Sequence, residues 1–307
     1  MWYHIIEKVY VFKIGADIMY KNVEMSAYSS MKTGGTAPEC YFPETEEELC
    51  GIIDLLEEQN KHYYVFGNMS NVLIPDGILD FVPVITTKMN SWQVTEKENG
   101  EVSVYALCGA SLTRLAFDMC KNGYGDMTFA YGIPGTVGGA VFMNAGAYGG
   151  EICQVTEYVM CYDIKSRKTV RVESADCGFG YRSSAFQKNG LIILGAGLTL
   201  KKGNAEELTA TAKQTMQKRV DKQPLEYPSC GSAFKRPEGY FAGELIEKSG
   251  LKGYCVGGAY VSEKHAGFII NKGGATTDDV LGLIKAVQDK VKENFGVDLE
   301  PEIQVVK

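Results

Sequence analysis

The stretch Gly132-Ile-Pro-Gly-Thr-Val-Gly-Gly-Ala-Val-Phe-Met-Asn-Ala-Gly-Ala-Tyr-Gly-Gly150 is rich in glycine and other small residues. Each internal glycine costs a helix or strand about 0.5–1 kcal/mol relative to alanine, so regular structure alone does not call for this density. Glycine is favoured where the backbone needs a positive φ, or where another group lies against bare amides. The stretch therefore predicts either a smooth wall for a flat ligand with a phosphate, or a run of tight turns packed against a sheet.

A second glycine-containing turn, Gly67-Asn-Met-Ser-Asn71, follows the buried-strand pattern Tyr63–Phe66. Such a turn can form a concave nest of amides for an anion, and Ser70 and Asn71 add side-chain donors. Two such loops in one lobe favour a dinucleotide, because a pyrophosphate and a ring system both need accommodation. Neither the Rossmann fingerprint nor the P-loop motif is present, so those two nucleotide folds are not supported.

Strand, turn and helix signals alternate through about residue 200, too broken by glycine for a regular doubly wound sheet. Thr45 begins a capping-box pattern before a helix, and Ser111 is a good N-cap for a helix over Leu112–Lys121. Beyond Lys201, the pattern predicts a polar-rich helix over Ala205–Lys222 and a second long helix capped by Thr277. The C-terminal part therefore reads as a separate α/β lobe.

These signals predict three parts: residues 1–30 as a short helical or irregular lead-in, 31–202 as the ligand-binding region and 203–307 as the second lobe. The net charge of −7 and the pI near 5.2 argue against a nucleic-acid or anionic-membrane partner. The nine cysteines are an odd number without Cys-x-x-Cys or zinc spacing, which indicates free thiols and no metal site. Without a signal-peptide core or a long apolar run, we expect a cytoplasmic protein.

The stretch Gln223-Pro-Leu-Glu-Tyr-Pro-Ser-Cys-Gly-Ser-Ala-Phe-Lys-Arg-Pro237 frames Ser232 with prolines and a glycine, which predicts a rigid loop presenting one hydroxyl. Lys235 and Arg236 follow and Arg219 precedes, a group of cations that would suit a diphosphate. A nucleophilic serine has low support, because the Gly-x-Ser-x-Gly elbow is absent and His265 is the only downstream histidine. Cys230 is interpreted as structural, since no feature of the sequence lowers the pKa of its thiol.

Three further motifs have a functional and a structural interpretation each. In Phe179-Gly-Tyr-Arg-Ser-Ser184 an arginine can present its planar fork to a carboxylate or enolate, or lie on the surface before a turn. In Val261-Ser-Glu-Lys-His-Ala-Gly-Phe-Ile-Ile-Asn271 the histidine can border a ligand or make a structural hydrogen bond. The closing segment Leu299-Glu-Pro-Glu-Ile303 is either a solvated tail or a source of a carboxyl group for a site.

Gly132-Ile-Pro-Gly-Thr-Val-Gly-Gly139, followed by Met143-Asn-Ala-Gly-Ala-Tyr-Gly149, resembles the flavin-binding signature of the UDP-N-acetylenolpyruvoylglucosamine reductase family. At least five motifs resemble that family in the right order over roughly residues 28–305. A missing type-specific tyrosine insertion between Ala242 and Ala275 suggests the family's shorter second type. The resemblance implies an α+β fold, with a two-part FAD-binding region of the vanillyl-alcohol-oxidase/PCMH type and a C-terminal α/β substrate-binding lobe.

The resemblance also implies roles for individual residues. The catalytic residues would be Arg182 and Glu302, which stabilise an enolate, and Ser232, which donates a proton. The implied FAD-binding residues are Gly67, Asn68, Met69, Ser70, Asn71, Gly132, Ile133, Pro134, Gly135, Thr136, Gly138, Gly139, Asn144, Ala145 and Gly146. The implied substrate-binding residues are Tyr148, Arg219, Lys235, Arg236 and His265.

One residue departs from the family pattern: Met69 stands where the phosphate loop of the family has glycine. A methionine tolerates positive φ poorly, so the local backbone is in question. We expect Met69 to weaken or reshape pyrophosphate binding without abolishing it, and Met69→Gly to bind FAD at least as tightly as the parent.

The reaction implied by the resemblance is reduction of UDP-N-acetylglucosamine enolpyruvate, a UDP-sugar. Hydride passes from N5 of non-covalently bound FAD to C3 of the enolpyruvyl ether, Ser232 protonates C2, and NADPH reduces the flavin beforehand. A monomer is expected. Two alternatives stay open: a PCMH-type oxidase of an alcohol or sugar, against which the Ser232 loop argues, and a non-catalytic flavin- or nucleotide-binding protein, which Met69 favours.

Overall fold

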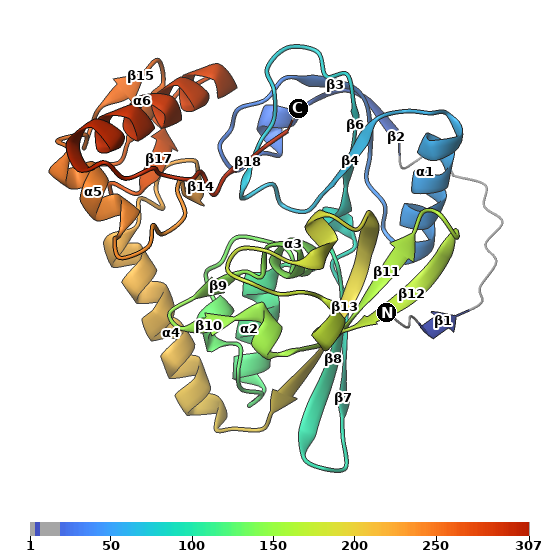
Figure 1. Cartoon of the computed structure of the whole chain (residues 1–307). Coiled ribbons are helices and arrows are strands. Elements are labelled where there is room, and N and C mark those ends of the chain that lie inside the picture. The colour runs from blue at the N-terminus through green and yellow to red at the C-terminus, as the bar shows by residue number, and fades with distance from the viewer. Residues whose placement is uncertain (1–3, 7–18, 307) are drawn as a thin grey trace. The chain divides into compact units, whose positions relative to one another are not determined.

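The computed structural model describes residues 4–6 and 19–306, which belong to two compact units (Figure 1). Among these residues, unit 1 comprises 4–6, 19–20, 39–68 and 81–217, and unit 2 comprises 21–38, 69–80 and 218–306. The units interleave along the chain, whereas the sequence patterns place boundaries only near residues 30 and 202. Two N-terminal segments fold with the C-terminal lobe, an arrangement that local sequence patterns do not reveal.

Unit 1 is built around a six-stranded sheet in which every neighbouring pair is antiparallel. In spatial order its strands are β1 (His4–Ile6), β12 (Lys168–Glu173), β11 (Thr156–Asp163), β13 (Leu191–Lys201), β8 (Glu101–Leu107) and β7 (Trp92–Glu96). Alternate residues of β8 are buried, so one face of this strand contacts the core. Hydrophobic patterns in the sequence predict four of these strands, over residues 102–107, 155–162, 169–172 and 191–200, and do not predict β1 or β7.

A smaller sheet, in the order β2-β3-β6-β4, carries the first glycine turn at its end. Its strands are β2 (Met19–Glu24), β3 (Thr36–Tyr41), β6 (Val82–Ile85) and β4 (Tyr63–Phe66), and β3 and β4 both run parallel to β6. The prediction of a helical or irregular lead-in is wrong for 4–6 and 19–24, which form strands, and holds for 25–30, a 3-10 helix followed by turns. The rest of that prediction, for residues 1–3 and 7–18, lies outside the described residues.

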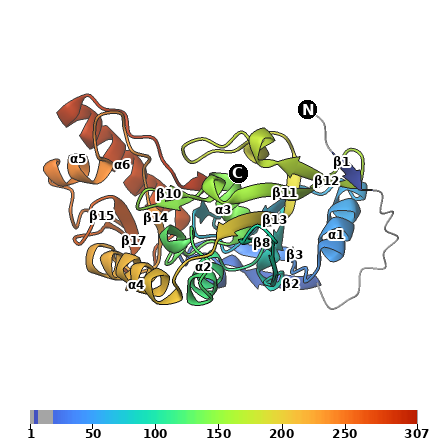
Figure 2. The same ribbon diagram turned by 90° about the horizontal axis from the view of Figure 1, so that it is seen from below.

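Three helices complete the core of unit 1: α1 (Glu46–Glu58), α2 (Leu112–Lys121) and α3 (Val137–Met143). The predicted N-caps are confirmed, because the Thr45 hydroxyl accepts from Glu48 N and the Ser111 hydroxyl accepts from Arg114 N. The apolar faces of all three helices join the sheet in one buried cluster, with α2 and α3 beside β8 and β13 in Figure 2. This packing positions the glycine-rich stretch, which begins just before α3.

Short elements fill the connections of the two units. The two-residue strands β9 (Gly146–Ala147) and β10 (Gly150–Glu151) form a hairpin that ends the glycine-rich stretch. The 3-10 helices are η2 (Met25–Ala27), η3 (Thr86–Lys88), η4 (Thr128–Ala130), η5 (Ile152–Gln154), η6 (Ser174–Asp176) and η7 (Ala185–Gln187).

Unit 2 is an α/β lobe with its own buried cluster. Its antiparallel sheet has the order β14 (Ser229–Ser232), β17 (Phe268–Asn271), β16 (Ala259–Val261) and β15 (Cys255–Val256). Helices α5 (Ala242–Lys248) and α6 (Thr277–Phe295) pack in this lobe, and α4 (Ala205–Lys222) runs from unit 1 into it. The N-cap of α6 is Thr276 and not the predicted Thr277, because the Thr276 hydroxyl accepts from Asp279 N. Helix α6 therefore begins at Thr277, one residue earlier than a cap at Thr277 would place it.

The two N-terminal segments of unit 2 are held by buried polar contacts. The Thr277 hydroxyl donates to Ile74 O at 2.6 Å, and Asn271 Nδ2 donates to Met31 O at 3.0 Å. Both side chains are almost fully buried, so each contact satisfies a polar group inside the lobe. A parallel pair, β5 (Val72–Leu73) with β18 (Gln304–Val305), joins the second segment to the C-terminal end.

Candidate functional site

Within unit 1, Gly67 and Asn68 of the first glycine turn lie against the loop at 132–139. A Cβ atom added to Gly67 would stand 2.2 Å from Thr136 Oγ1, far inside van der Waals contact. Beside it, Asn68 Nδ2 donates a hydrogen bond of 2.6 Å to Pro134 O. The fold therefore brings together two motifs that the sequence separates by more than sixty residues, as a shared dinucleotide site requires.

The loop at 132–139 is held by the first turn of α2 and by the segment between β8 and α2. The Thr113 hydroxyl donates to Ile133 O at 2.7 Å and accepts from Gly132 N at 3.1 Å. A Cβ atom on Gly138 would lie 2.8 Å from the Cβ of Cys108. Sequence patterns gave no sign of the role of Thr113, because its hydroxyl lies in a helix with no other distinctive feature.

The opposite side of the same loop is accessible. Pro134 and Gly139 are exposed, and a Cβ atom on Gly139 would meet only Thr136, at an ordinary 3.5 Å. The packing interpretation of the glycine density is borne out at Gly67 and Gly138, where no Cβ atom would fit. Pro134 and Gly139 leave one side of the loop open, and the binding of a flavin dinucleotide against this glycine wall stays a prediction.

Asn144 lies at the end of α3, in the left-handed conformation with φ 43°. Its side chain is fully buried, and Nδ2 donates to Glu151 Oε2 at 3.0 Å and to Gly180 O at 2.9 Å. Its Oδ1 accepts from Cys153 N at 3.2 Å. The structure places this predicted FAD-binding residue in an internal network, so its direct contact with the cofactor stays a prediction.

Arg182 is presented by a tight turn in which Gly180 pairs with Ser183. Its backbone has φ 52°, and Nη2 donates to Gly146 O at 3.1 Å. Tyr148, half exposed, is two residues along the same β9–β10 hairpin. Unit 1 thus holds the predicted enolate-stabilising arginine against the segment that carries a predicted substrate-binding tyrosine.

Unit 2 holds Ser232 by its backbone on both sides. Ser232 is exposed at the end of β14, where it pairs with Phe268 of β17. Its neighbour Ala233 donates from N to Gly267 O at 2.8 Å, and Ala233 O accepts from Glu302 N at 2.9 Å. The loop is therefore rigid for a reason beyond its prolines: it is hydrogen-bonded between two other segments.

This pairing brings Glu302 next to the Ser232 strand. Lys235 N donates to Glu300 O at 2.9 Å, and Phe234 bridges with Pro301, which extends the contact between the two segments. The Glu302 carbonyl accepts from Asn71 Nδ2 at 3.0 Å. Three predicted site residues, Ser232, Glu302 and Asn71, are thus assembled in unit 2 from three distant parts of the chain.

The predicted cation cluster has partners within the protein. Lys235 Nζ forms an ion pair with Glu300 Oε1 at 2.5 Å. The Arg236 guanidinium lies over the Phe241 ring at 4.0 Å, with Nε donating to Tyr240 O. Arg219 is half-buried near the end of α4. Binding of a diphosphate by these side chains stays a prediction, and at Lys235 it would compete with a carboxylate.

Of two reactive residue types in unit 2, His265 is half-buried and Cys230 is buried. His265 Nδ1 accepts from Gly267 N at 3.1 Å, and its ring meets Phe268 edge-on at 4.9 Å. Burial lowers the pKa of His265, which favours the neutral ring. Burial raises the pKa of Cys230 to about 12, in line with its structural interpretation. The structural hydrogen bond expected for His265 is present, and its contact with substrate stays a prediction.

Met69 occupies a conformation suited to glycine. Its φ is 44°, and only 3% of the residue is exposed. The side chain is therefore a buried part of unit 2, while the backbone keeps the left-handed turn that glycine would adopt freely. Ser70 follows, half-buried.

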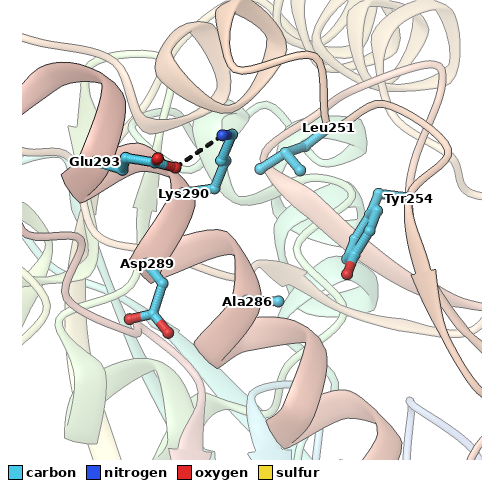
Figure 3. A pocket seen from close by; sticks show the side chains of 6 residues that line it. All are labelled: Leu251, Tyr254, Ala286, Asp289, Lys290 and Glu293. Atoms are coloured by element: carbon cyan, nitrogen blue, oxygen red, sulfur yellow. Dashed lines mark hydrogen bonds and ion pairs between the residues drawn. The ribbon is translucent and has the colours of Figure 1, made fainter.

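One pocket of about 510 Å³ lies elsewhere on unit 2 (Figure 3). Lys290 and Glu293 on its rim form an ion pair of 2.7 Å, and no predicted site residue is among its lining: Leu251, Tyr254, Ala286, Asp289, Lys290 and Glu293. Within residues 4–6 and 19–306 there is no cluster of three metal-ligating side chains. No helix in the described part of the chain is long and apolar enough to span a membrane.

Comparison with protein families gives two matches. A profile of FAD binding domains matches residues 39–163, and a profile of the C-terminal domain of UDP-N-acetylenolpyruvoylglucosamine reductase matches residues 223–306. The first contains both glycine loops of unit 1, and the second contains Ser232, His265 and Glu302.

Individual proteins are similar over nearly the whole chain. The UDP-N-acetylenolpyruvoylglucosamine reductase of Clostridium novyi is 45% identical over 285 residues, covering 93% of this chain and 91% of the relative. That of Lactobacillus acidophilus is 42% identical over 298 residues, covering 96% of each. The crystal structure of the Thermus caldophilus enzyme is similar with a TM-score of 0.79 and 31% identity, covering 93% of this chain and 98% of the other. The predicted fold class, α+β with a two-part FAD-binding region and a C-terminal lobe, is confirmed.

Proposed function

This chain belongs to the UDP-N-acetylenolpyruvoylglucosamine reductase family and is a FAD-containing reductase of peptidoglycan precursor synthesis, and we propose that NADPH is its reductant and that Arg182, Ser232 and Glu302 carry its chemistry. The observation that carries the proposal is the pairing of the Ser232 strand with the Glu302 segment. Two residue types useful for proton transfer and charge stabilisation are held there on one rigid backbone frame.

The glycine wall of unit 1 would hold the cofactor. Among Gly67, Asn68 and residues 132–139, the exposed Asn68, Pro134 and Gly139 are the open positions of this wall, suited to a ring system and a pyrophosphate. FAD held there and reduced by NADPH would supply the hydride that adds to C3 of the enolpyruvyl group of UDP-N-acetylglucosamine enolpyruvate. The protein supplies position and electrostatics, so the remaining steps belong to its side chains.

Hydride addition at C3 places negative charge on C2 and the adjoining carboxylate as an enolate. The planar guanidinium of Arg182, already fixed by its bond to Gly146 O, offers several donors to this charge. Glu302 supports the enolate as a neutral or hydrogen-bond-sharing acid. Ser232 then donates its hydroxyl proton to C2, which completes UDP-N-acetylmuramate. Tyr148, Arg219, Lys235, Arg236 and His265 are the proposed substrate contacts.

Anaerobic spectroscopy of the purified holoprotein tests the function. NADPH should bleach the yellow flavin absorbance, and UDP-N-acetylglucosamine enolpyruvate should then restore it. An alcohol or sugar oxidase would instead need oxygen and no nicotinamide, and a binding protein would not cycle at all. Bleaching without reoxidation by the enolpyruvyl substrate would reject the proposed reaction.

The proposed setting is the cytoplasm, with a monomer acting on a UDP-sugar and no nucleic-acid or membrane partner. The net charge of −7 and the nine free cysteines support it. Light scattering after size exclusion measures the oligomeric state, and a concentration-independent dimer mass would contradict the monomer.

A further inference from the structure

Asn71 makes two hydrogen bonds with the segment that carries Glu302. Its side-chain Nδ2 donates to Glu302 O at 3.0 Å, and its backbone O accepts from Gln304 N at 2.9 Å. The residues are 231 positions apart in the sequence, yet both lie in unit 2. The contact continues into the parallel pairing of β5 with β18, so the turn and the C-terminal segment form one backbone unit.

The other side of Glu302 is held by the Ser232 strand. Glu302 N donates to Ala233 O, so the N–H and the C=O of this residue are bonded to different segments. Gln304 Nε2 also donates to Glu302 O at 3.1 Å, but Gln304 is exposed and Asn71 is half-buried. The side-chain amide of Asn71 is therefore the better shielded of the two side-chain donors that fix the carbonyl.

We propose that Asn71 is a positioning residue that sets the place of the Glu302 carboxyl relative to Ser232, a role that rests on the proposed function of Glu302. Loss of the Asn71 amide frees one side of the Glu302 backbone while Ala233 still holds the other. The carboxyl then samples more orientations in the step that forms and protonates the enolate. Reduction of the flavin by NADPH does not use Glu302 and is not expected to change.

The same turn offers a matched comparison. Asn68 also uses its Nδ2 to hold a backbone carbonyl, but that carbonyl belongs to Pro134 in the glycine loop of unit 1. Asn68→Ala should therefore act through FAD binding, whereas Asn71→Ala should in addition slow the step that uses Glu302.

The central variant is Asn71→Asp, which keeps the size of the side chain and replaces the donor by an acceptor; Asn71→Ser is a second variant if the first fails to fold. Because Asn71 also belongs to the predicted FAD-binding turn, FAD affinity is titrated on the apoprotein and both half-reactions are measured at saturating FAD; we expect the anaerobic bleaching rate to change less than the rate of reoxidation. Reoxidation by the enolpyruvyl substrate should slow about 3–10-fold, the factor expected for one hydrogen bond. Hydrogen exchange of residues 300–306 in the apoprotein should become faster.

A double-mutant cycle shows whether Asn71 acts through Glu302. In a Glu302→Ala background, Asn71→Asp should cause no further slowing of reoxidation. Additive slowing, or weaker FAD binding with both half-reactions slowed, would overturn the proposal and make Asn71 a cofactor contact. If Glu302→Ala alone keeps the parental reoxidation rate, the proposed function of Glu302 fails. Faster exchange in Asn71→Asp would then identify a purely structural anchor, and the positioning role would fail with it.

Discussion

The two candidate sites of this protein are built in opposite ways. The glycine wall of unit 1 is mostly one contiguous stretch, Gly132–Gly150, supplemented by the Gly67 turn. The second candidate site, in unit 2, consists of Asn71, Ser232 and Glu302, which lie far apart in the chain. A binding surface made of backbone amides can be predicted from one stretch of sequence, because a high glycine content leaves those amides uncovered. A site made of single side chains depends on tertiary contacts to bring them together.

The largest expected effect tests the scattered site. Ser232→Ala should leave anaerobic bleaching by NADPH unchanged and slow reoxidation by the enolpyruvyl substrate by about 10²–10⁴, the usual loss for a positioned acid. Ser232→Cys should recover part of the rate, because a thiol of similar size is the better acid. Stopped-flow absorbance follows each half-reaction separately.

Ser229→Ala provides the control for Ser232, since Ser229 begins the same strand three residues earlier. It should leave both half-reactions near the parental rate. Equal slowing of both halves by Ser232→Ala would show a disturbed flavin site, and the proton-donor assignment would have to be abandoned.

Arg182→Lys tests the side chain that unit 1 contributes. Lysine keeps the charge but loses the planar fork, and losing one donor to transition-state charge costs about 2.7–4 kcal/mol. Reoxidation should slow by roughly 10²–10³. Arg167 has the same φ of 52° and is exposed in an ion pair with Glu58, so Arg167→Lys is a matched control expected to be silent. A near-parental rate for Arg182→Lys would exclude Arg182 as the enolate stabiliser.

Gly67→Ala and Gly139→Ala separate the two uses of glycine in the wall. The added Cβ at Gly67 would collide with Thr136, so the apoprotein should lose about 1–3 kcal/mol of stability along with FAD affinity. Gly139→Ala meets no such clash inside α3 and should leave apoprotein stability equal or higher, while FAD affinity falls. Thermal melts and FAD titrations of both apoproteins decide it. Parental FAD binding by Gly139→Ala would mean that this exposed face is not the ligand face.

The smallest effect on FAD binding is expected at Met69. Met69→Gly relieves a left-handed conformation worth about 1–2 kcal/mol, but removing a buried methionine side chain costs about 2–5 kcal/mol. The apoprotein should therefore lose roughly 1–3 kcal/mol of stability on balance. The FAD affinity of the folded protein should still equal or exceed that of the parent. Clearly weaker FAD binding at a temperature where the variant is folded would contradict this expectation.

Local signals predicted many of the elements well. The helix over Leu112–Lys121 begins after Ser111 as its N-cap position predicts, because a hydroxyl that accepts from the first turn is a short-range interaction. The cap of α6 was displaced by one residue, since Thr276 and Thr277 are chemically alike and only packing separates them. Thr277 turns inward and donates to Ile74 O, which leaves Thr276 to cap the helix.

By itself, the sequence determined the glycine loops, the main helices and strands and the resemblance to a reductase family, because each depends on residues close together in the chain. Tertiary structure alone decided that residues 21–38 and 69–80 belong to the C-terminal lobe, and that Met69 is buried. It also decided that Asn71 reaches the carbonyl of Glu302. The physical reason is that these features depend on hydrogen bonds and packing between segments up to 231 residues apart, which no local pattern of hydrophobicity or turn residues encodes.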